Sequence, residues 1–191
     1  MGEINFFEEK ISEGAKTLLK SEVKAILEAV LFATDEPIAL SKLKAIVEPF
    51  QDLPPKAIGA LLQEMRDEYA SAARGFTLEE IAGGYLLRTK KEYAPFLATL
   101  APGKRTERLS AAASEVLAIV AYKGPITRPQ IEQIRGVDSA GSVTALLERG
   151  LIDEVGKGEG PGKPTLYGVT PRFLQLFGLK TISDLPKLPS T

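Results

Sequence analysis

The chain has 191 residues, with 24 Lys and Arg against 25 Asp and Glu, and a formal net charge of −1. It contains neither cysteine nor histidine, which excludes disulfides, thiolate nucleophiles, imidazole bases and the commonest zinc ligands. The charge is uneven: residues 1–103 hold 12 basic and 16 acidic side chains (net −4), and residues 104–180 hold 11 and 8 (net +3). A duplex-DNA reader usually carries a stronger basic footprint, so any direct contact with nucleic acid should be weak or confined to the second half.

No segment predicts export or a membrane span. The longest uninterrupted apolar run is Val116 to Tyr122, far short of the roughly 18 residues that a spanning helix needs. The N-terminal stretch MGEINFFEEK is acidic and lacks the apolar core of a signal peptide. These features predict a cytoplasmic protein with no membrane partner.

Apolar spacing predicts three helices and then a hairpin in the first half of the chain. The periodic apolar residues of the three helices span 23–31, 40–47 and 58–69, and the third helix follows the Pro54-Pro55 pair. Residues 76–81 and 85–89 predict two strands joined by a turn at Gly83-Gly84. A last short helix should follow, and Pro95 predicts that it begins late or is kinked. The residues expected to line the four helices are Val23, Ile26, Leu27, Val30, Leu31, Leu40, Leu43, Val47, Ile58, Leu61, Leu62, Met65, Tyr69, Tyr93, Phe96 and Leu97.

The second half repeats this order. The stretch EAVLFATDEPIALSKLKAI (28–46) corresponds to SEVLAIVAYKGPITRPQIEQI (114–134), so that Pro37 matches Pro125 and Ile38 matches Ile126. A repeat of this length indicates two copies of one small domain.

Helix ends are clearer in the second copy. Ser110 is placed to cap its first helix, Thr127 and Gln130 form a capping box on its second, and Gly150 suits the left-handed exit of its third. Asp138 or Ser139 should cap that third helix. The inner faces are expected to hold Ala113, Val116, Leu117, Val120, Val143, Leu146 and Leu147.

Two strands, 151–155 and 165–169, should flank a Gly-rich wing, and a final helix should run from Thr170-Pro171 to Gly178. The wing invites comparison with a phosphate-binding P-loop, but Lys157 stands where that motif needs Gly and Pro164 where it needs Ser or Thr. A mobile wing is the better interpretation.

Acidic pairs at Glu79-Glu80 and Asp153-Glu154 do not predict an enzyme. Neighbouring strand residues point to opposite faces, so the two carboxylates of each pair should diverge instead of sharing a metal ion or a proton. With no histidine or cysteine either, we predict no catalysis, no metal and no cofactor.

The third helix of each copy lacks the Arg, Lys, Asn or Gln stripe that reads base edges. In the first copy Lys56 and Arg66 are accompanied by acidic residues, and in the second Arg149 follows Glu148. A protein-contacting role is favoured for both helices.

Residues 109–179 resemble the C-terminal domain of bacterial segregation and condensation protein B. The resemblance is carried by LSAAASEVLAIVAYKGPITRPQIEQIRGVDS, LLERGLI, PGKPTLYGVTPRFLQLFGL and a final DLP. Residues 18–100 resemble the family's N-terminal domain more loosely, mainly through LKSEVKAILEAVLFATDEPI. One departure is Lys163 before Pro164, where the family is associated with Arg, so the charge is kept but a bidentate contact is lost.

The resemblance implies a mainly α protein with small antiparallel β-wings, built as two tandem winged-helix domains. The expected organisation is an N-terminal extension (1–17), a dimerising winged-helix domain (18–100), a linker (101–108), a kleisin-binding winged-helix domain (109–180) and a partly disordered tail (181–191).

The implied function is that of a non-catalytic, homodimeric accessory subunit of the bacterial SMC–kleisin complex in chromosome condensation and segregation. It would bind the kleisin, segregation and condensation protein A, reach the SMC ATPase through it, and lie at the nucleoid with weak or indirect DNA contact. The alternative is a winged-helix transcription regulator, against which the weak basic character argues.

Candidate contact residues follow from residue type. Tyrosine combines apolar area with a hydroxyl and is favoured in interfaces, and arginine suits an acidic partner segment. We expect kleisin contacts at Tyr122, Arg128, Arg135, Tyr167 and Phe173, dimer contacts at Tyr69 and Tyr85, and weak phosphate contacts at Lys157, Lys163 and Arg172. The alternative for each tyrosine is half-burial in its own domain, and the alternative for the charged residues is a solvated surface.

Overall fold

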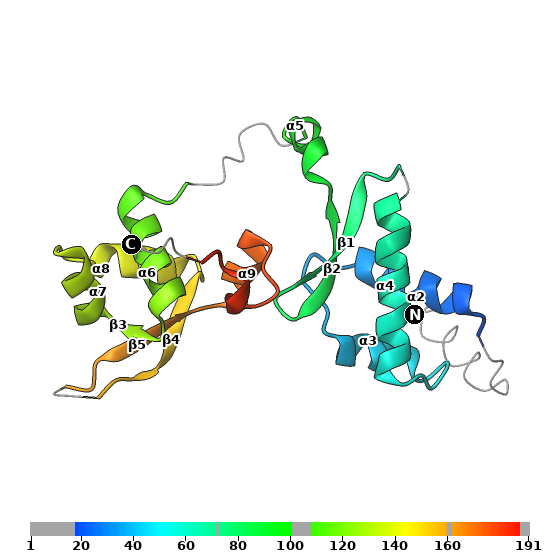
Figure 1. Cartoon of the computed structure of the whole chain (residues 1–191), viewed down its shortest axis with the longest axis horizontal. Helices are drawn as coiled ribbons and strands as arrows, with labels where there is room; N and C mark the ends of the chain where they lie inside the picture. The colour runs from blue at the N-terminus through cyan, green and yellow to red at the C-terminus, as the bar shows by residue number, and fades with distance from the viewer. Residues whose placement is uncertain (1–17, 72, 101–107, 160–161, 188–191) are drawn as a thin grey trace, which may run out of the picture. The chain divides into compact units, whose positions relative to one another are not determined.

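The computed structural model describes residues 18–71, 73–100, 108–159 and 162–187 (Figure 1). The predicted N-terminal extension and all but the last residue of the predicted linker lie outside these ranges. The chain divides into two compact units, residues 1–100 and 101–191. Both are mainly helical with a small antiparallel sheet, which confirms the predicted fold class at that level. Within the described ranges no helix is long and apolar enough to cross a membrane.

In the described part of the first unit, three helices precede a hairpin and a short helical end (Figure 1). Its elements are α2 (Lys20–Phe32), α3 (Leu40–Val47), α4 (Pro55–Ser71), β1 (Phe76–Ile81), β2 (Gly84–Thr89), a 3₁₀ turn (Lys91–Tyr93) and α5 (Ala94–Leu97).

The core of the first unit is the set of apolar faces that helical spacing predicts. Val23, Leu27 and Leu31 of α2 are at most 1% exposed, and the five predicted positions of α4 are all buried. Leu78 of β1 joins the same cluster. In α5, by contrast, the predicted apolar residues are exposed, with Phe96 at 71%.

The hairpin turn lies one residue earlier than its glycine pair suggests. Ile81 pairs with Gly84, so the turn is Ala82-Gly83, and both residues have positive φ (50° and 73°), as a type I′ turn requires. Gly84 is the first residue of β2. A glycine is needed there because a Cβ would lie 2.9 Å from the main-chain carbonyl carbon of Ile38. Ile38 exchanges two backbone hydrogen bonds of 2.9 Å with Tyr85 and so extends the sheet on the far side of β2.

The second unit repeats this order of elements, with a two-residue strand in the place of the single Ile38 bridge (Figure 1). Its elements are α6 (Ala111–Lys123), β3 (Ile126–Thr127), α7 (Arg128–Arg135), α8 (Ala140–Glu148), β4 (Ile152–Lys157), β5 (Thr165–Val169), α9 (Pro171–Phe177) and a 3₁₀ turn (Ile182–Asp184). The sheet order is β3-β5-β4, all antiparallel, with Ile126 opposite Tyr167. Ile38 and Ile126 therefore hold equivalent places in the two units.

Predicted helix ends in the second unit are confirmed by their hydrogen bonds. The Ser110 hydroxyl accepts from the Ala113 N–H at 3.1 Å, and the Gln130 side chain accepts from the Thr127 N–H at 2.9 Å. Gly150 has φ 63° and donates to the Leu147 carbonyl at 2.8 Å, the arrangement of a Schellman end.

One strand end differs from the prediction. Strand β4 runs to Lys157 through a bulge at Val155, so the wing loop is shorter than the predicted stretch from Gly156. The described part of the predicted tail, residues 181–187, contacts the second unit through Leu185 and Pro186. Leu185 packs against the core, and the Tyr122 hydroxyl donates to the Pro186 carbonyl at 2.8 Å. Residues 188–191 lie outside the described ranges.

Candidate partner-binding surfaces

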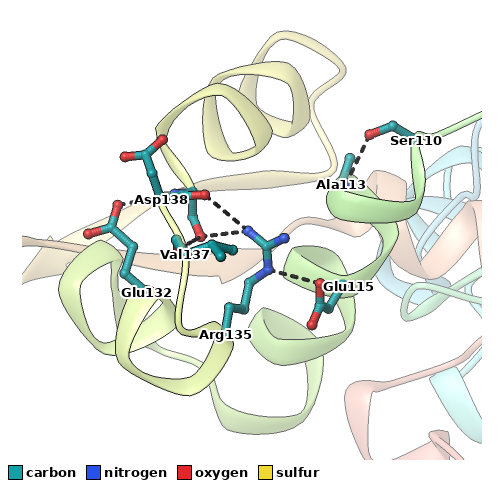
Figure 2. A network of polar contacts seen from close by, with 8 residues as sticks. Ser110, Ala113, Glu115, Glu132, Arg135, Val137 and Asp138 are labelled. Atoms are coloured by element: carbon teal, nitrogen blue, oxygen red, sulfur yellow. Dashed lines mark hydrogen bonds and ion pairs between the residues drawn. The ribbon is translucent and has the colours of Figure 1, made fainter.

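The turn between α7 and α8 is held by one arginine (Figure 2). Arg135 Nε donates to Glu115 Oε2 of α6 at 3.0 Å, and Nη1 donates to Ser139 Oγ at 2.8 Å and to the Asp138 carbonyl at 3.3 Å. Its side chain is only 6% exposed. One guanidinium thus ties α6, α7 and the start of α8 together.

Two carboxylates complete this network at the N-terminus of α8. Glu132 Oε1 accepts from the Ser139 N–H at 3.2 Å, and Asp138 Oδ2 accepts from the Ala140 N–H at 3.2 Å. Both bonds satisfy backbone donors that a helix start leaves without an intrahelical partner. Nε and Nη1 of Arg135 are therefore engaged inside the unit, and a contact of Arg135 with the kleisin stays a prediction. Arg128 has a 51% exposed side chain, 3.5 Å from Glu132 Oε1.

The aromatic residues predicted to meet the kleisin occupy different environments. Phe173 is 3% exposed and belongs to the core, with its ring centroid 4.7 Å from that of Phe177. Tyr167 is half-buried against the same core. Tyr122 is 38% exposed, although its hydroxyl is bonded to Pro186. Tyr122 and Arg128 are thus the predicted kleisin contacts with the most accessible side chains, whereas Phe173 stabilises the unit itself.

The three cations predicted to touch phosphates lie on separate elements. Lys157 of β4 donates to Thr165 Oγ1 at 2.7 Å and lies 3.9 Å from Glu154. Lys163 is exposed in the wing loop, with φ 43°, and Arg172 is exposed at the start of α9. Phosphate contact by these residues stays a prediction.

The tyrosines predicted for dimerisation are not exposed. Tyr69 is 3% exposed; its ring meets Phe76 edge-on at 5.2 Å, and the Arg74 guanidinium lies 5.3 Å from its centroid. Burial, reinforced by the neighbouring Glu28 carboxylate, raises the pKa of Tyr69 to about 12. Tyr85 is half-buried where it pairs with Ile38. The expectation that Tyr69 offers a surface ring is corrected: it packs in the core.

The carboxylates of the Glu79-Glu80 pair lie near two different arginines. Glu79 lies 3.5 Å from Arg88 and Glu80 lies 3.6 Å from Arg66, so the two carboxylates diverge to different partners. Among the described residues no three His, Cys, Asp or Glu side chains gather as metal ligands.

Charges on the third helix of the first unit are paired within the unit. Glu64 of α4 lies 2.6 Å from Lys20 Nζ and 3.0 Å from Lys24 Nζ, and Lys24 also bonds to Glu68. The hydrogen bond from Lys20, followed by that from Lys24, lowers the pKa of Glu64. This acidic, intramolecularly paired face is not suited to reading bases.

A groove in the first unit was not predicted from the sequence. It has a volume of about 520 Å³ and lies between α2 and β2, with Ala25, Ala29 and Leu87 in its lining. Phe32, at the end of α2, stands beside it with 83% of its surface exposed. A second helical stripe was visible in the sequence, because residues 25, 29 and 32 share one face of α2 apart from the inner one.

Comparison with known proteins gives consistent matches over most of the chain. The family profile described as "Segregation and condensation complex subunit ScpB" matches residues 25–188. Segregation and condensation protein B of Geobacillus kaustophilus is 48% identical over 170 residues, covering 88% of this chain and 76% of the relative.

Solved structures give two further likenesses. The crystal structure of ScpB from Mycobacterium tuberculosis is 34% identical, with a TM-score of 0.42, and the match covers 86% of this chain and 99% of that one. A crystal structure of a dimer of the ScpB N-terminal domain complexed with ScpA peptide is 38% identical, with a TM-score of 0.39, and covers 42% of this chain and 96% of that one. Because the profile spans both units and the relative's identity extends over nearly nine-tenths of the sequence, this chain belongs to the ScpB family of segregation and condensation complex subunits.

Proposed function

We propose that this chain is a non-catalytic accessory subunit of a bacterial SMC–kleisin complex that supports chromosome condensation and segregation. It acts at the nucleoid as a homodimer, binds the kleisin ScpA, and reaches the SMC ATPase through that kleisin. The observation that carries the proposal is the family match over residues 25–188, which includes both compact units.

We further propose that each unit is a winged helix. The order helix, strand, helix, helix, hairpin occurs twice, with a single bridge at Ile38 in place of the strand in the first unit. In both units this first segment pairs with the second strand of the hairpin. The wings are the β1–β2 and β4–β5 hairpins, and neither third helix carries a base-reading face.

The two units have separate tasks in this proposal. The first (18–100) dimerises, and the second (109–180) binds the kleisin. Arg128 offers an exposed guanidinium to an acidic kleisin segment, with Tyr122 as the accessible aromatic residue and Tyr167 as a half-buried one. The hydrogen bonds of Arg135 to Glu115 and Ser139 hold α7 against α6 and α8, and so fix the position of Arg128 at the start of α7.

Light scattering on a size-exclusion column tests both tasks. The chain alone should elute as a dimer, and mixing with ScpA should give a stable two-to-one complex. Arg128→Glu should weaken ScpA binding about 5-fold to 100-fold, since a reversed charge repels the acidic partner. Lys56→Glu is the matched control, because Lys56 is an exposed cation of the first unit.

A chain that elutes as a monomer and does not bind ScpA would contradict the proposal. Specific binding to a short duplex, with affinity falling steeply as salt rises, would instead support a winged-helix transcription regulator.

A further inference from the structure

We propose that α2 forms the self-association surface of this chain, with Phe32 of each copy inserted into the groove of the other. This inference rests on the homodimer of the proposed function and adds which surface joins the two copies. It starts from an exposed apolar side chain beside an apolar hollow, an arrangement that an isolated unit leaves unsatisfied.

The first step is the shape of α2. Its inner face packs in the core through Val23, Leu27 and Leu31. Its second stripe carries two exposed alanines, Ala25 and Ala29, and then Phe32 at 83% exposure. Small side chains let another helix approach closely, and the phenyl ring supplies the large apolar area that anchors an interface.

The second step is self-complementarity. In a two-fold dimer the same patch serves both copies, so a projecting group must lie beside a hollow of matching shape. Two antiparallel α2 helices that cross between Glu28 and Ala29 place Phe32 of each copy over Ala25 of the other, because both residues lie about one helical turn from the crossing. The hollow of about 520 Å³ beside Ala25 and Ala29 is large enough for a phenyl ring.

The charges of the groove agree with a second copy as its occupant. Its lining includes one carboxylate, Glu28, and one guanidinium, Arg88. A lining with one acid and one base gives the groove no net charge, and a strongly acidic or strongly basic partner would be opposed by like charge at one of the two.

The direct test is light scattering on Phe32→Ser in the full chain. The apparent dissociation constant of the dimer should rise about 30-fold or more, as for an aromatic residue central to an interface. Phe96→Ser is the matched control, since Phe96 is 71% exposed on α5 of the same unit, and it should leave the dimer unchanged. Circular dichroism should show both variants folded.

The absence of native cysteine allows a geometric test as well. When the two helices cross between residues 28 and 29, the two copies of residue 29 lie about 1.5 Å apart along the helix axis, so Ala29→Cys can link the copies while Phe32 stays in place. This variant should give a covalent dimer on oxidation. Ala25→Cys, whose two copies lie about 10 Å apart along the axis, should not.

The outcomes separate this inference from the proposed function. A wild-type chain that is monomeric overturns both. A wild-type dimer that Phe32→Ser leaves intact, with no cross-link, overturns the inference alone. A Phe32→Ser dimer that stays intact but no longer binds an ScpA peptide assigns the groove to the kleisin and also overturns it.

Discussion

The two units share one order of elements but position their third helix by different means. In the first unit α4 has 17 residues and is joined to α3 through residues 48–54, which include two prolines. It is held by apolar burial and by exposed ion pairs from Lys20 and Lys24 of α2. In the second unit α8 has 9 residues and follows a four-residue turn, residues 136–139, that the buried Arg135 guanidinium bonds from within.

The comparison shows what a short turn requires. A short turn that packs against other helices buries its backbone donors and acceptors, and each buried group needs a hydrogen-bond partner. A long helix instead buries enough apolar surface to fix its own position. The third helix is therefore positioned by buried hydrogen bonds in the second unit and by buried apolar surface in the first.

Matched core truncations have the largest expected effect. Leu62 of α4 and Leu146 of α8 are both 0% exposed. Replacing either by Ala should lower the unfolding free energy of its own unit by about 2–5 kcal/mol, through lost burial and the cavity left behind. Hydrogen exchange measured by mass spectrometry across a urea series follows each unit by its own peptides. If Leu146→Ala weakened protection equally in both units, they would unfold as one body and the comparison would not hold.

The buried tyrosine of the first unit predicts alkaline sensitivity confined to that unit. Tyr69 has its pKa raised from 10.0 to about 12. Below pH 10 it is protonated in both the folded and unfolded states, so the stability is fully present. Between pH 10 and 12 the unfolded state ionises first, and about 2–3 kcal/mol is lost as pH rises. Tyr69→Phe should remove this part of the loss in denaturant titrations at pH 9 to 12. An unchanged pH profile would contradict the assignment.

Substitutions of Arg135 and Arg66 test whether a buried arginine network stabilises the second unit more than a surface ion pair stabilises the first. Arg135→Met should destabilise the second unit by about 1–2 kcal/mol, since it leaves the Ser139 hydroxyl and the Asp138 carbonyl without their donor, while the 56% exposed Glu115 can turn to water. Arg66→Met in the first unit removes a 3.6 Å ion pair to Glu80 and a 3.4 Å hydrogen bond to Gln63, both partly exposed, and should cost less than about 1 kcal/mol. Both are read from unit-resolved hydrogen exchange. Equal costs would mean that the buried network contributes no more than a surface pair.

The smallest expected changes in stability come from substitutions at the N-caps of α2 and α6. Ser110 caps α6, so Ser110→Ala should destabilise the second unit by about 1 kcal/mol. The equivalent position in the first unit is Leu19, 67% exposed and without a side-chain cap, although its N–H donates to Glu22 at 2.7 Å. Leu19→Ser should therefore stabilise that unit by about 0.5–1 kcal/mol, measured by thermal unfolding. A loss of stability there would show that Leu19 packs more than its exposure suggests.

Local patterns predicted much of this fold. The apolar spacing of α2, α4 and α6, the Ser110 cap, the Thr127–Gln130 pair and the Gly150 exit depend on contacts within a few residues, and all are present. The candidate surfaces were predicted less well. Tyr69, Arg135 and Phe173 were chosen by residue type, and each is buried in its own unit.

The sequence by itself determined the helices, their ends, the repeat and the family, because these depend on residue type and short-range spacing. Only the tertiary structure decided which side chains are free. Arg128 and Arg135 flank one helix with the same charge, yet Arg135 is bonded to Glu115, 20 residues away, and is 6% exposed, whereas Arg128 lies near Glu132 of the same helix and is 51% exposed. The groove beside Phe32 likewise exists only because β2, more than 50 residues later in the chain, lies against α2. Exposure and groove shape follow from such long-range contacts, which no local pattern encodes.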